Sequence, residues 1–566
     1  MDSPRIVIIG GVAAGPKAAA RARRLMPRAD ITIVERGRFL SYAGCGMPYF
    51  IEGKIKEVNE LICTSAGVPR DSVFFEKVKN VKALNRTLAT RIDRKAKVVE
   101  VVRVDSGERE ILPYDKLVIA TGGLPVKLPI NGADLKHVFY LNQPDDALAI
   151  WDAVHSGNVK RAVIIGGGLI GMEVTGALAA NGIEVSIVEM LDHLLPAALD
   201  PEMAAFLTKH VSAKGVHVFT GEKVQRIESD SVGNVRKVIT DQREIPAEMV
   251  LLAVGVRPNV QLAKDAGIEI GQSGGIVVNE FMQTSDPDIY AGGDCVEVTD
   301  VVGGRKIHWP MGSAANKQGR VIGDNLAGRR SVFRGTVGTG VLKVFDYNVG
   351  RTGLTEQQAR TLGYEVVTSL CPSPDCTHFM PEARLVLVKM VADAKNGRLL
   401  GIQAVGPGEA VKRVDVVATA LHFGATVDQI GELDLGYAPP YATAIDVVAH
   451  AANIIQNKRT GLARGVTPYE VKAKLDRGEP FVWLDVRTQR EYDEMRIEDS
   501  RIRLIPLGRL RERIAELPRD QEIIAFCKIS LRAYEAQRIL QEHGFENVSF
   551  MDGGITAWPF DVVRIT

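Results

Sequence analysis

The sequence predicts an α/β fold with two Rossmann-like dinucleotide-binding domains, an α+β third domain and a small C-terminal α/β domain. The main observation is a pattern of strand, glycine-rich turn, helix, strand and acidic residue that occurs twice. Its copies are RIVIIGGVAAGPKAAARARRL…DITIVER and RAVIIGGGLIGMEVTGALAANGIEVSIVEM. The second observation is a final segment of about 100 residues in which FVWLDVR and EIIAFCK read as short buried strands.

Composition narrows the class of protein. The chain has 566 residues, a formal net charge of +1, 46% hydrophobic and 25% charged residues. These values are typical of a globular protein and give no general attraction to nucleic acid or to a membrane surface. No apolar run approaches the roughly 20 residues of a transmembrane helix, and no secretory signal opens the chain. Six cysteines are too few for a disulfide scaffold, so a cytoplasmic location is expected.

Further strands suggest the domain borders. YDKLVIATGGLP lies between the two copies and TSDPDIYAGGDC follows them, and both read as a buried strand that ends in a turn. The first dinucleotide-binding domain is therefore expected to be interrupted by the second. QNKRTGLARGV is polar and contains glycine, as linkers do. The predicted parts are a first domain at 1–123 with 254–330, a second at 124–253, a third at 331–455, a linker at 456–465 and a last domain at 466–566.

The second copy predicts an NAD site. Gly166, Gly168 and Gly171 form an intact G-x-G-x-x-G between a strand and a helix. Such glycines allow a tight turn, close approach of a pyrophosphate and close helix packing. Glu189 ends the next strand, where a carboxylate binds ribose hydroxyls and repels a 2′-phosphate. NADH is therefore favoured over NADPH.

The first copy keeps Gly10, Gly15 and the acidic Glu35, but Val12 replaces the middle glycine. Two such folds, joined by ATGG and YAGGD, resemble the two-dinucleotide flavoprotein disulfide reductases over about residues 1–455. The resemblance implies FAD in the first fold and NAD in the second.

The same resemblance names residues around the flavin. It implies that Thr121 and Gly122 of ATGG contribute to the cofactor site and that Asp294 of YAGGD bonds the ribityl chain. An aspartate that only caps a turn is the alternative for Asp294.

The segment FLSYAGCGMPYFI holds one cysteine, Cys45, where typical members of that superfamily carry C-x4-C. It is similar instead to the coenzyme A disulfide reductases, whose segment resembles SYxxCGxPYxI. That resemblance implies that Cys45 attacks a disulfide or persulfide and holds one sulfur until reduced flavin breaks the bond. The thiol must be a thiolate for this, stabilised by a helix N-terminus or by nearby donors. A buried, inert cysteine is the alternative.

The resemblance also implies a coenzyme A site at Arg21, Arg24 and Ser41. Arg21 and Arg24 are three positions apart and so share one helix face, which could equally be a solvated basic face. The family commonly has Asn where this chain has Gly44, so one contact to coenzyme A is expected to be missing.

A homodimer follows from LGYAPPYATAIDVV, which resembles the family's segment that reaches the partner's active site. Tyr437 would then donate a proton near Cys45 of the other protomer. A second tyrosine is usual in this family, and Phe379 stands in the matching stretch THFMPEA.

The remaining thiols have plainer interpretations. Cys371 and Cys376 are read as two unrelated thiols, with a redox-active pair as one alternative and a zinc site with His378 as another. Because the zinc site would lack a fourth ligand, no metal is predicted. Cys63 and Cys295 have no chemistry around them in the sequence.

The tail predicts a second reactive cysteine. Cys527 follows the strand EIIAF and opens a tight loop before a helix, an arrangement that makes a nest for anions. With WLDVR, Cys-x4-Arg and DGGITAW, residues of about 466–566 are similar to rhodanese domains. This implies that Arg532 anchors the loop and that Lys528 attracts anionic sulfur donors. Ser530 stands where glycine is common. An inactive binding fold is the alternative.

Together these features favour an enzyme in which NADH reduces FAD and FAD reduces a sulfur bond at Cys45. The expected substrates are low-molecular-weight persulfides, polysulfides or coenzyme A disulfide, with coenzyme A carrying sulfane sulfur from Cys527. One alternative is an NADH oxidase or peroxidase that cycles Cys45 through sulfenic acid. Another is a persulfide carrier or redox sensor without reductase activity.

Overall fold

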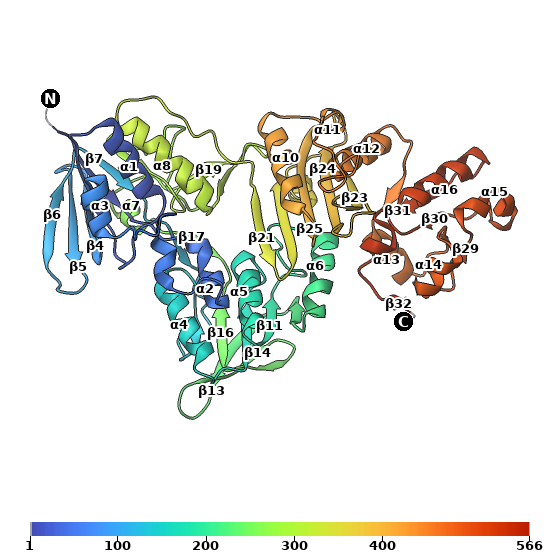
Figure 1. The fold of residues 1–566 in the computed structure, drawn as a ribbon, viewed down its shortest axis with the longest axis horizontal. Coiled ribbons are helices and arrows are strands. Elements are labelled where there is room, and N and C mark those ends of the chain that lie inside the picture. The colour runs from blue at the N-terminus through green and yellow to red at the C-terminus, as the bar shows by residue number, and fades with distance from the viewer. Residues whose placement is uncertain (1–2, 565–566) are drawn as a thin grey trace. The chain divides into compact units, whose positions relative to one another are not determined.

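Figure 1 shows a computed structural model of the chain, which describes residues 3–564. The chain divides into two compact units. The first comprises Met1–Leu191 and Gly215–Thr336, and the second comprises Asp192–Lys214 and Val337–Thr566. No helix within residues 3–564 is both long and apolar enough to cross a membrane.

The first unit contains a five-stranded parallel sheet in the order β18-β7-β1-β2-β3. Its isoleucine-rich strands are buried on both faces, as parallel strands covered by helices must be. β18 follows the second glycine-rich pattern in sequence but pairs with β7, so two separate stretches of chain build this sheet. The strands are β1 (Arg5–Ile9), β2 (Asp30–Val34), β3 (Lys82–Leu84), β7 (Lys116–Ile119) and β18 (Ile289–Ala291).

Two helices, α1 (Ala14–Leu25) and α8 (Gly312–Leu326), pack side by side in this part of the unit (Figure 1). Small residues allow the close approach. A Cβ atom at Gly319 would lie 2.4 Å from the Ala14 carbonyl oxygen, and one at Gly323 would lie 2.5 Å from Cβ of Arg21. Larger side chains there would push the helices apart.

A second parallel sheet of the same unit has the order β12-β11-β10-β16-β9. The helix α5 (Leu169–Ala180) follows the central strand β10, and α2 (Met47–Glu52) packs against α5 and α4 (Pro144–His155). Antiparallel strands β8 (Gly123–Pro125) and β17 (Val256–Pro258) connect the two sheets along the chain. The five strands are β9 (Val138–Phe139), β10 (Arg161–Ile165), β11 (Glu184–Glu189), β12 (His217–Thr220) and β16 (Met249–Leu252).

The second unit begins with an antiparallel sheet in the order β21-β22-β25-β24-β23. Two helices, α10 (Ala410–His422) and α12 (Val447–Arg459), pack against it. The strands are β21 (Gly340–Val344), β22 (Tyr347–Gly353), β23 (Val366–Pro374), β24 (Leu385–Asp393) and β25 (Leu399–Gly406).

A buried lysine explains why α6 (Pro201–Ala213) belongs to this second unit although its sequence lies within the second dinucleotide-binding pattern. Lys389 of β24 is ion-paired with Asp200 at 3.2 Å, Glu202 at 3.1 Å and Glu356 at 2.7 Å. Separating these groups would leave charges buried without partners, which is costly. The segment 192–214 is therefore held by the third domain.

The C-terminal part of the second unit is a parallel sheet in the order β26-β31-β30-β27-β29. Helix α12 continues to Arg459, so the first four residues of the predicted linker 456–465 are helical. The strands and helices are β26 (Gly465–Val466), β27 (Val482–Asp485), β29 (Ile502–Leu504), β30 (Ile523–Phe526), β31 (Val548–Met551), α13 (Pro468–Asp476), α14 (Gln489–Glu494), α15 (Leu510–Arg513) and α16 (Leu531–Glu542).

Candidate active sites

The two glycine-rich loops are built in the same way. Gly11 N–H donates to Oε2 of Glu35 at 2.7 Å, and Gly167 N–H donates to Oε2 of Glu189 at 2.7 Å. The other oxygen of each carboxylate accepts the N–H two residues further along the chain. A carboxylate has about four acceptor positions, so each of these can still accept a ribose hydroxyl.

Steric contact explains two glycines of each loop. A Cβ atom at Gly10 would lie 1.9 Å from the Ala120 carbonyl oxygen, and one at Gly15 would lie 2.0 Å from that of Gly10. In the second loop a Cβ at Gly166 would lie 2.5 Å from the Ala253 carbonyl oxygen, and one at Gly171 would lie 2.1 Å from that of Gly166. No other residue type fits these positions without moving the backbone.

Gly168 differs because a Cβ there would meet no atom within 4 Å. The open space lies at the start of α5, whose first turn has no side-chain cap and no acidic residue. The same is true of α1, which begins after the first loop. Uncapped N–H groups at a helix start favour a phosphate, so these loops fit the pyrophosphates of FAD and NAD.

The ends of β7 and β18 fit the rest of a flavin cofactor. Thr121 and Gly122 are held by Asn259, which accepts from Oγ1 of Thr121 at 2.6 Å and donates to the Gly122 carbonyl oxygen at 2.9 Å. Asp294 is half-buried, and its carboxylate accepts no hydrogen bond within the part of the chain that the structure describes. Burial raises the pKa of Asp294. An unpaired acceptor here suits a hydroxyl donor such as a ribityl chain.

Cys45 lies in a short 3₁₀ turn, Gly44–Gly46, directly before α2. The residue as a whole is exposed to solvent. Partial burial of the sulfur, followed by the nearby Glu173 carboxylate, raises the pKa of Cys45. The polypeptide alone thus opposes the thiolate that the sequence analysis expects.

Glu173 is a site residue that the sequence analysis missed. It lies on α5, accepts no hydrogen bond from the described residues, and burial raises its pKa to about 7. It also raises the pKa of Tyr49 on α2, where burial is the larger cause. The available signal was composition, since Glu173 is the one charged residue of the helix LIGMEVTGALAA.

The three residues expected to contact coenzyme A differ in exposure and in their partners within the chain. Ser41 has a left-handed backbone (φ 47°), and its N–H donates to the Gly11 carbonyl oxygen at 2.7 Å, beside the first glycine-rich loop. Arg24 is exposed. Arg21 is instead ion-paired with Asp324 of α8 at 2.6 Å and is mostly buried. A coenzyme A contact by Arg21 would compete with this pair.

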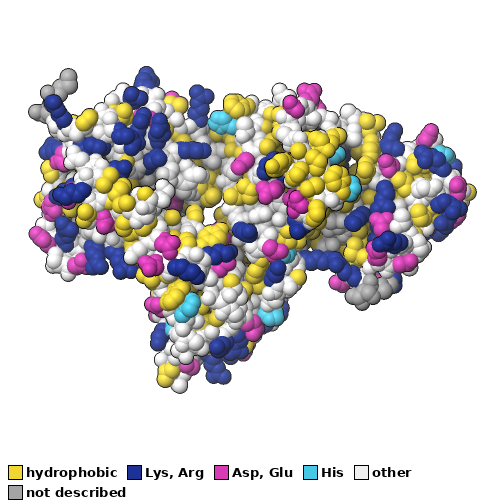
Figure 2. Space-filling view, viewed as in Figure 1, with side chains coloured by type: hydrophobic (Ala, Val, Ile, Leu, Met, Phe, Trp, Pro, Cys, Tyr) yellow, Lys and Arg dark blue, Asp and Glu magenta, His cyan; other side chains and the backbone are white. Residues whose placement is uncertain are grey.

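Tyr437 lies on a loop between α11 (Val427–Gly431) and α12, with 54% of its surface exposed. It belongs to the second unit and Cys45 to the first. Figure 2 shows hydrophobic side chains gathered over the α10–α12 part of the second unit, and a patch of this kind typically marks an interface. Exposed apolar residues of this part are Phe379, Phe423, Leu433, Tyr441 and Ile445.

The other thiols of the described residues form no disulfide. Cys371 is buried in β23, and burial raises its pKa to about 12. Cys295 is buried, and its Sγ donates to the Gly292 carbonyl oxygen at 3.4 Å. Within residues 3–564 no three His, Cys, Asp or Glu side chains are grouped to bind a metal.

Cys527 follows β30 directly and is fully buried. Its carbonyl oxygen accepts from the Ile555 N–H at 2.9 Å, and that of Lys528 accepts from the Thr556 N–H at 3.1 Å. The N–H groups of residues 528–530 donate to no group within 3–564. Ser530 has φ 92°, a conformation that favours glycine, which is why glycine is common at this position. The loop therefore keeps free donors beside the sulfur.

Arg532 is fixed at the start of α16 by Glu491 of α14. Its Nη1 and Nη2 donate to the two oxygens of Glu491 at 2.7 Å and 2.6 Å. These hydrogen bonds hold the pKa of Glu491 at about 2. Glu491 and then Cys527 raise the pKa of Arg532. The cation next to Cys527 is thus permanent and rigidly placed.

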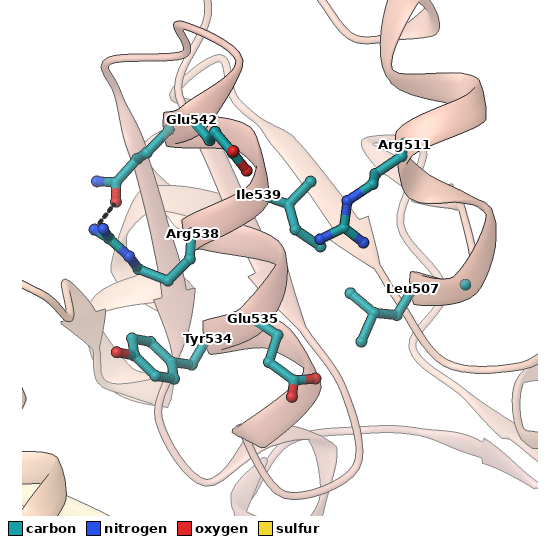
Figure 3. Close-up of a pocket in the computed structure, with 9 residues that line it drawn as sticks. Leu507, Arg511, Tyr534, Glu535, Arg538, Ile539 and Glu542 are labelled. Carbon is teal, nitrogen blue, oxygen red and sulfur yellow. Dashed lines mark hydrogen bonds between the residues drawn. The ribbon is translucent and has the colours of Figure 1, made fainter.

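The same domain has an open groove of about 850 Å³ between α15 and α16 (Figure 3). Residues 527–532 of the cysteine loop contribute nothing to its lining. The lining residues are Leu507, Gly508, Arg511, Tyr534, Glu535, Arg538, Ile539, Gln541 and Glu542.

The fold and the sites define a flavin-dependent oxidoreductase that uses a pyridine nucleotide. The chain belongs to the pyridine nucleotide-disulphide oxidoreductase family, whose model matches residues 4–319. The dimerisation domain of that family matches residues 340–449, and a rhodanese-like domain matches 467–559.

Individual relatives agree with this assignment. An NAD(P)H coenzyme A polysulfide/persulfide reductase from Pyrococcus horikoshii is 37% identical over 458 residues, which cover 80% of this chain and 98% of the relative. The structure of an NAD-dependent persulfide reductase from A. fulgidus is 44% identical, with a TM-score of 0.93 over 98% of this chain and 100% of that one. The reduced Bacillus anthracis protein CoADR-RHD is 34% identical, with a TM-score of 0.91 over 99% of this chain and 98% of that one.

Proposed function

We propose that the protein is an NADH-dependent reductase of low-molecular-weight persulfides and polysulfides, with coenzyme A disulfide as a further substrate. One observation carries the proposal. A chain with one exposed cysteine beside a flavin fold also holds a buried cysteine in a donor-lined loop, and a persulfide reductase matches both parts end to end. Sulfane sulfur is the substrate that needs both cysteines.

The overall reaction with a persulfide is RSSH + NADH + H⁺ → RSH + H₂S + NAD⁺. The S–S bond accepts two electrons and breaks, and each sulfur leaves with a proton. The first glycine-rich loop would hold FAD, which would supply the two-electron chemistry between NADH and sulfur. Cys45 attacks one sulfur of the substrate and holds it as a disulfide until the electron pair arrives. Glu189 selects NADH because its buried carboxylate repels a 2′-phosphate.

Proton delivery requires a second chain in this proposal. Tyr437 has no contact that buries it in its own unit, and it lies on the exposed apolar face of the dimerisation domain. In a homodimer it would enter the partner's site and donate a proton to the thiolate that leaves. Ser41 and Arg24 would contact coenzyme A, while Arg21 would have to give up its pair with Asp324 to do so.

Cys527 accepts sulfane sulfur as a persulfide in the second site. The free N–H groups of residues 528–530 and the Arg532 guanidinium would stabilise the terminal S⁻. Transfer to coenzyme A then gives the persulfide that Cys45 reduces.

The decisive experiment measures NADH oxidation and sulfide release with coenzyme A persulfide, polysulfide and coenzyme A disulfide in parallel. We expect sulfide in equal amount to the NADH oxidised with the first two substrates. Cys45→Ser should lower this rate by roughly 10³-fold or more while retaining flavin, because the nucleophile is lost. Cys63→Ser, which removes another thiol of the same unit, should oxidise NADH and release sulfide at the wild-type rate.

Cys527→Ser separates the two sites. It should abolish sulfur transfer from thiosulfate and leave reduction of coenzyme A disulfide intact. Rapid NADH oxidation by peroxide or oxygen without sulfide release would instead favour an oxidase or peroxidase. Absence of NADH oxidation with every sulfur substrate would favour a carrier or sensor.

A further inference from the structure

We propose that Lys458, a residue of α12 outside the rhodanese-like segment, is a positioning residue for the Cys527 loop and acts through Asp552. The inference rests on the proposed role of Cys527 as an acceptor of sulfane sulfur. It implies that α12 and β23, which lie outside the rhodanese-like segment, contribute directly to the geometry of the sulfur-transfer site. All residues involved belong to the second unit.

Lys458 lies one residue before the end of α12, and its ammonium group is almost enclosed. Nζ donates to the Thr368 carbonyl oxygen of β23 at 2.9 Å and to Oδ2 of Asp552 at 2.5 Å. The two side chains are 12% and 3% exposed. Burial raises the pKa of Asp552, and Lys458 opposes this effect by stabilising the carboxylate. Removing Lys458 would leave a buried charge without a partner.

Asp552 begins the turn that carries this contact towards Cys527. Gly553 and Gly554 follow it, both with a left-handed backbone (φ 72° and 56°). A Cβ at Gly553 would lie 3.1 Å from Leu370 of β23, and a Cβ at Gly554 would lie 2.4 Å from the Cys527 carbonyl oxygen. The turn is therefore held without free space between β23 on one side and the cysteine loop on the other.

The short helix after this turn, Gly554–Ala557, binds the Cys527 loop through two hydrogen bonds. Ile555 N–H donates to the Cys527 carbonyl oxygen and Thr556 N–H to that of Lys528. A trans peptide points its C=O and its N–H in opposite directions. Holding these two carbonyls therefore turns the N–H groups of Lys528 and Ile529 away from the helix, where they remain free for a persulfide.

Lys458 thus connects α12 and β23 to Asp552. Asp552 begins the glycine turn, and the helix after that turn holds the peptides proposed to bind sulfur. Lys458 touches none of the reacting atoms. Its loss should loosen the loop without removing any group that contacts the substrate.

The test uses the full-length flavin-loaded protein with Lys458→Met, which keeps the apolar stem and removes the charge. Arg459→Met is the matched control, because Arg459 ends the same helix but donates to the Ala394 carbonyl oxygen within the dimerisation domain. Amide hydrogen exchange at Ile555 and Thr556 measures how stably their two hydrogen bonds to the Cys527 loop are formed, and it does not depend on catalytic turnover. Sulfur transfer from thiosulfate and NADH-driven reduction of coenzyme A disulfide are measured alongside.

We expect Lys458→Met to accelerate exchange at Ile555 and Thr556 and to lower sulfur transfer, each by about tenfold. Disulfide reduction and the control should be unchanged. The double variant Lys458→Met/Asp552→Asn should recover most of the loss, because a neutral amide at 552 needs no cation.

Equal effects of Lys458→Met and Arg459→Met, or no recovery in the double variant, would overturn the inference. A wild-type protein without sulfur transfer would refute the proposed function of Cys527. The exchange data would still decide whether Lys458 positions the loop.

Discussion

The Glu173 carboxyl lies beside the Cys45 thiol and, after burial, has the largest effect in raising the pKa of that thiol. Burial raises the pKa of Glu173 itself to about 7. Glu173 therefore changes charge near neutral pH, and its carboxylate opposes the ionisation of Cys45 once it has lost its proton.

Glu173→Gln should make Cys45 more reactive. Removing the negative charge lowers the pKa of the thiol, so alkylation of Cys45 by iodoacetamide at neutral pH should accelerate by roughly threefold to tenfold. The pH profile of alkylation should also lose an inflection near pH 7. Glu184→Gln, at an exposed position of β11, is the control. Identical profiles for wild type and Glu173→Gln would contradict the coupling.

Two glycines of one loop should respond in opposite ways to alanine. Gly168→Ala adds a methyl group to open space, so the melting temperature should hold while the KM for NADH rises about tenfold as the pyrophosphate loses room. Gly171→Ala places the methyl group against the Gly166 carbonyl oxygen, which should destabilise the protein by about 1–3 kcal/mol. Thermal unfolding and the KM for NADH should be measured for both variants. An unchanged KM in Gly168→Ala would argue against a pyrophosphate at this loop.

Glu491→Gln should change how the Cys527 site responds to acid. The pKa of Glu491 is lowered from 4.5 to about 2, so its pair with Arg532 stabilises the fold above about pH 4.5, and this contribution is lost as pH falls towards 2. The pair is partly exposed, so the effect is on the order of 1 kcal/mol. Amide exchange in α14 and α16 should differ between wild type and variant above pH 4.5 and converge near pH 2.

Glu494→Gln is the control for this measurement, because Glu494 forms an exposed i,i+4 pair with Arg490 on the same helix. A difference between wild type and Glu491→Gln that persists undiminished at pH 2 would exclude the carboxylate as its source.

Tyr437 can be tested with mixed dimers. Tyr437→Phe alone should lower disulfide reduction by about 10²-fold, the usual effect of a lost proton donor. A heterodimer of Cys45→Ser and Tyr437→Phe chains retains one site with Cys45 from one chain and Tyr437 from the other. It should show about half of wild-type activity if the protomers share sites. Activity no higher than that of the Tyr437→Phe homodimer would place both groups in one chain.

Much of the fold could be predicted because its signals are local. Gly15 and Gly171 are required by contact with the glycine five positions earlier, so their spacing is a local signal. Gly10 and Gly166 instead lie against the backbone of Ala120 and Ala253, which follow the neighbouring strands β7 and β16. Cys527 also has a local signal, because a strand end and a tight turn create the nest. Ser530, which departs from the usual glycine, adopts the left-handed backbone that glycine favours.

Other site residues could not be predicted because their partners come from distant parts of the chain. Arg21 and Arg24 look alike on one helix, yet α8 supplies Asp324 to Arg21 alone. Residues 192–214 follow the second dinucleotide-binding pattern in sequence but belong to the second unit. Lys389 of that unit forms ion pairs with two of their carboxylates, Asp200 and Glu202. Glu173 gains its raised pKa from burial, which no local pattern encodes.

The sequence by itself was enough to predict the two glycine-rich loops, Cys45 and the strand-end position of Cys527, since each is marked by a motif of residues close together in the chain. Only the tertiary structure decided that Glu173 faces Cys45, that Asp324 holds Arg21, and that Lys458 reaches Asp552 behind the Cys527 loop. The physical reason is that charge pairing and burial act through space, and the folded chain alone sets those distances.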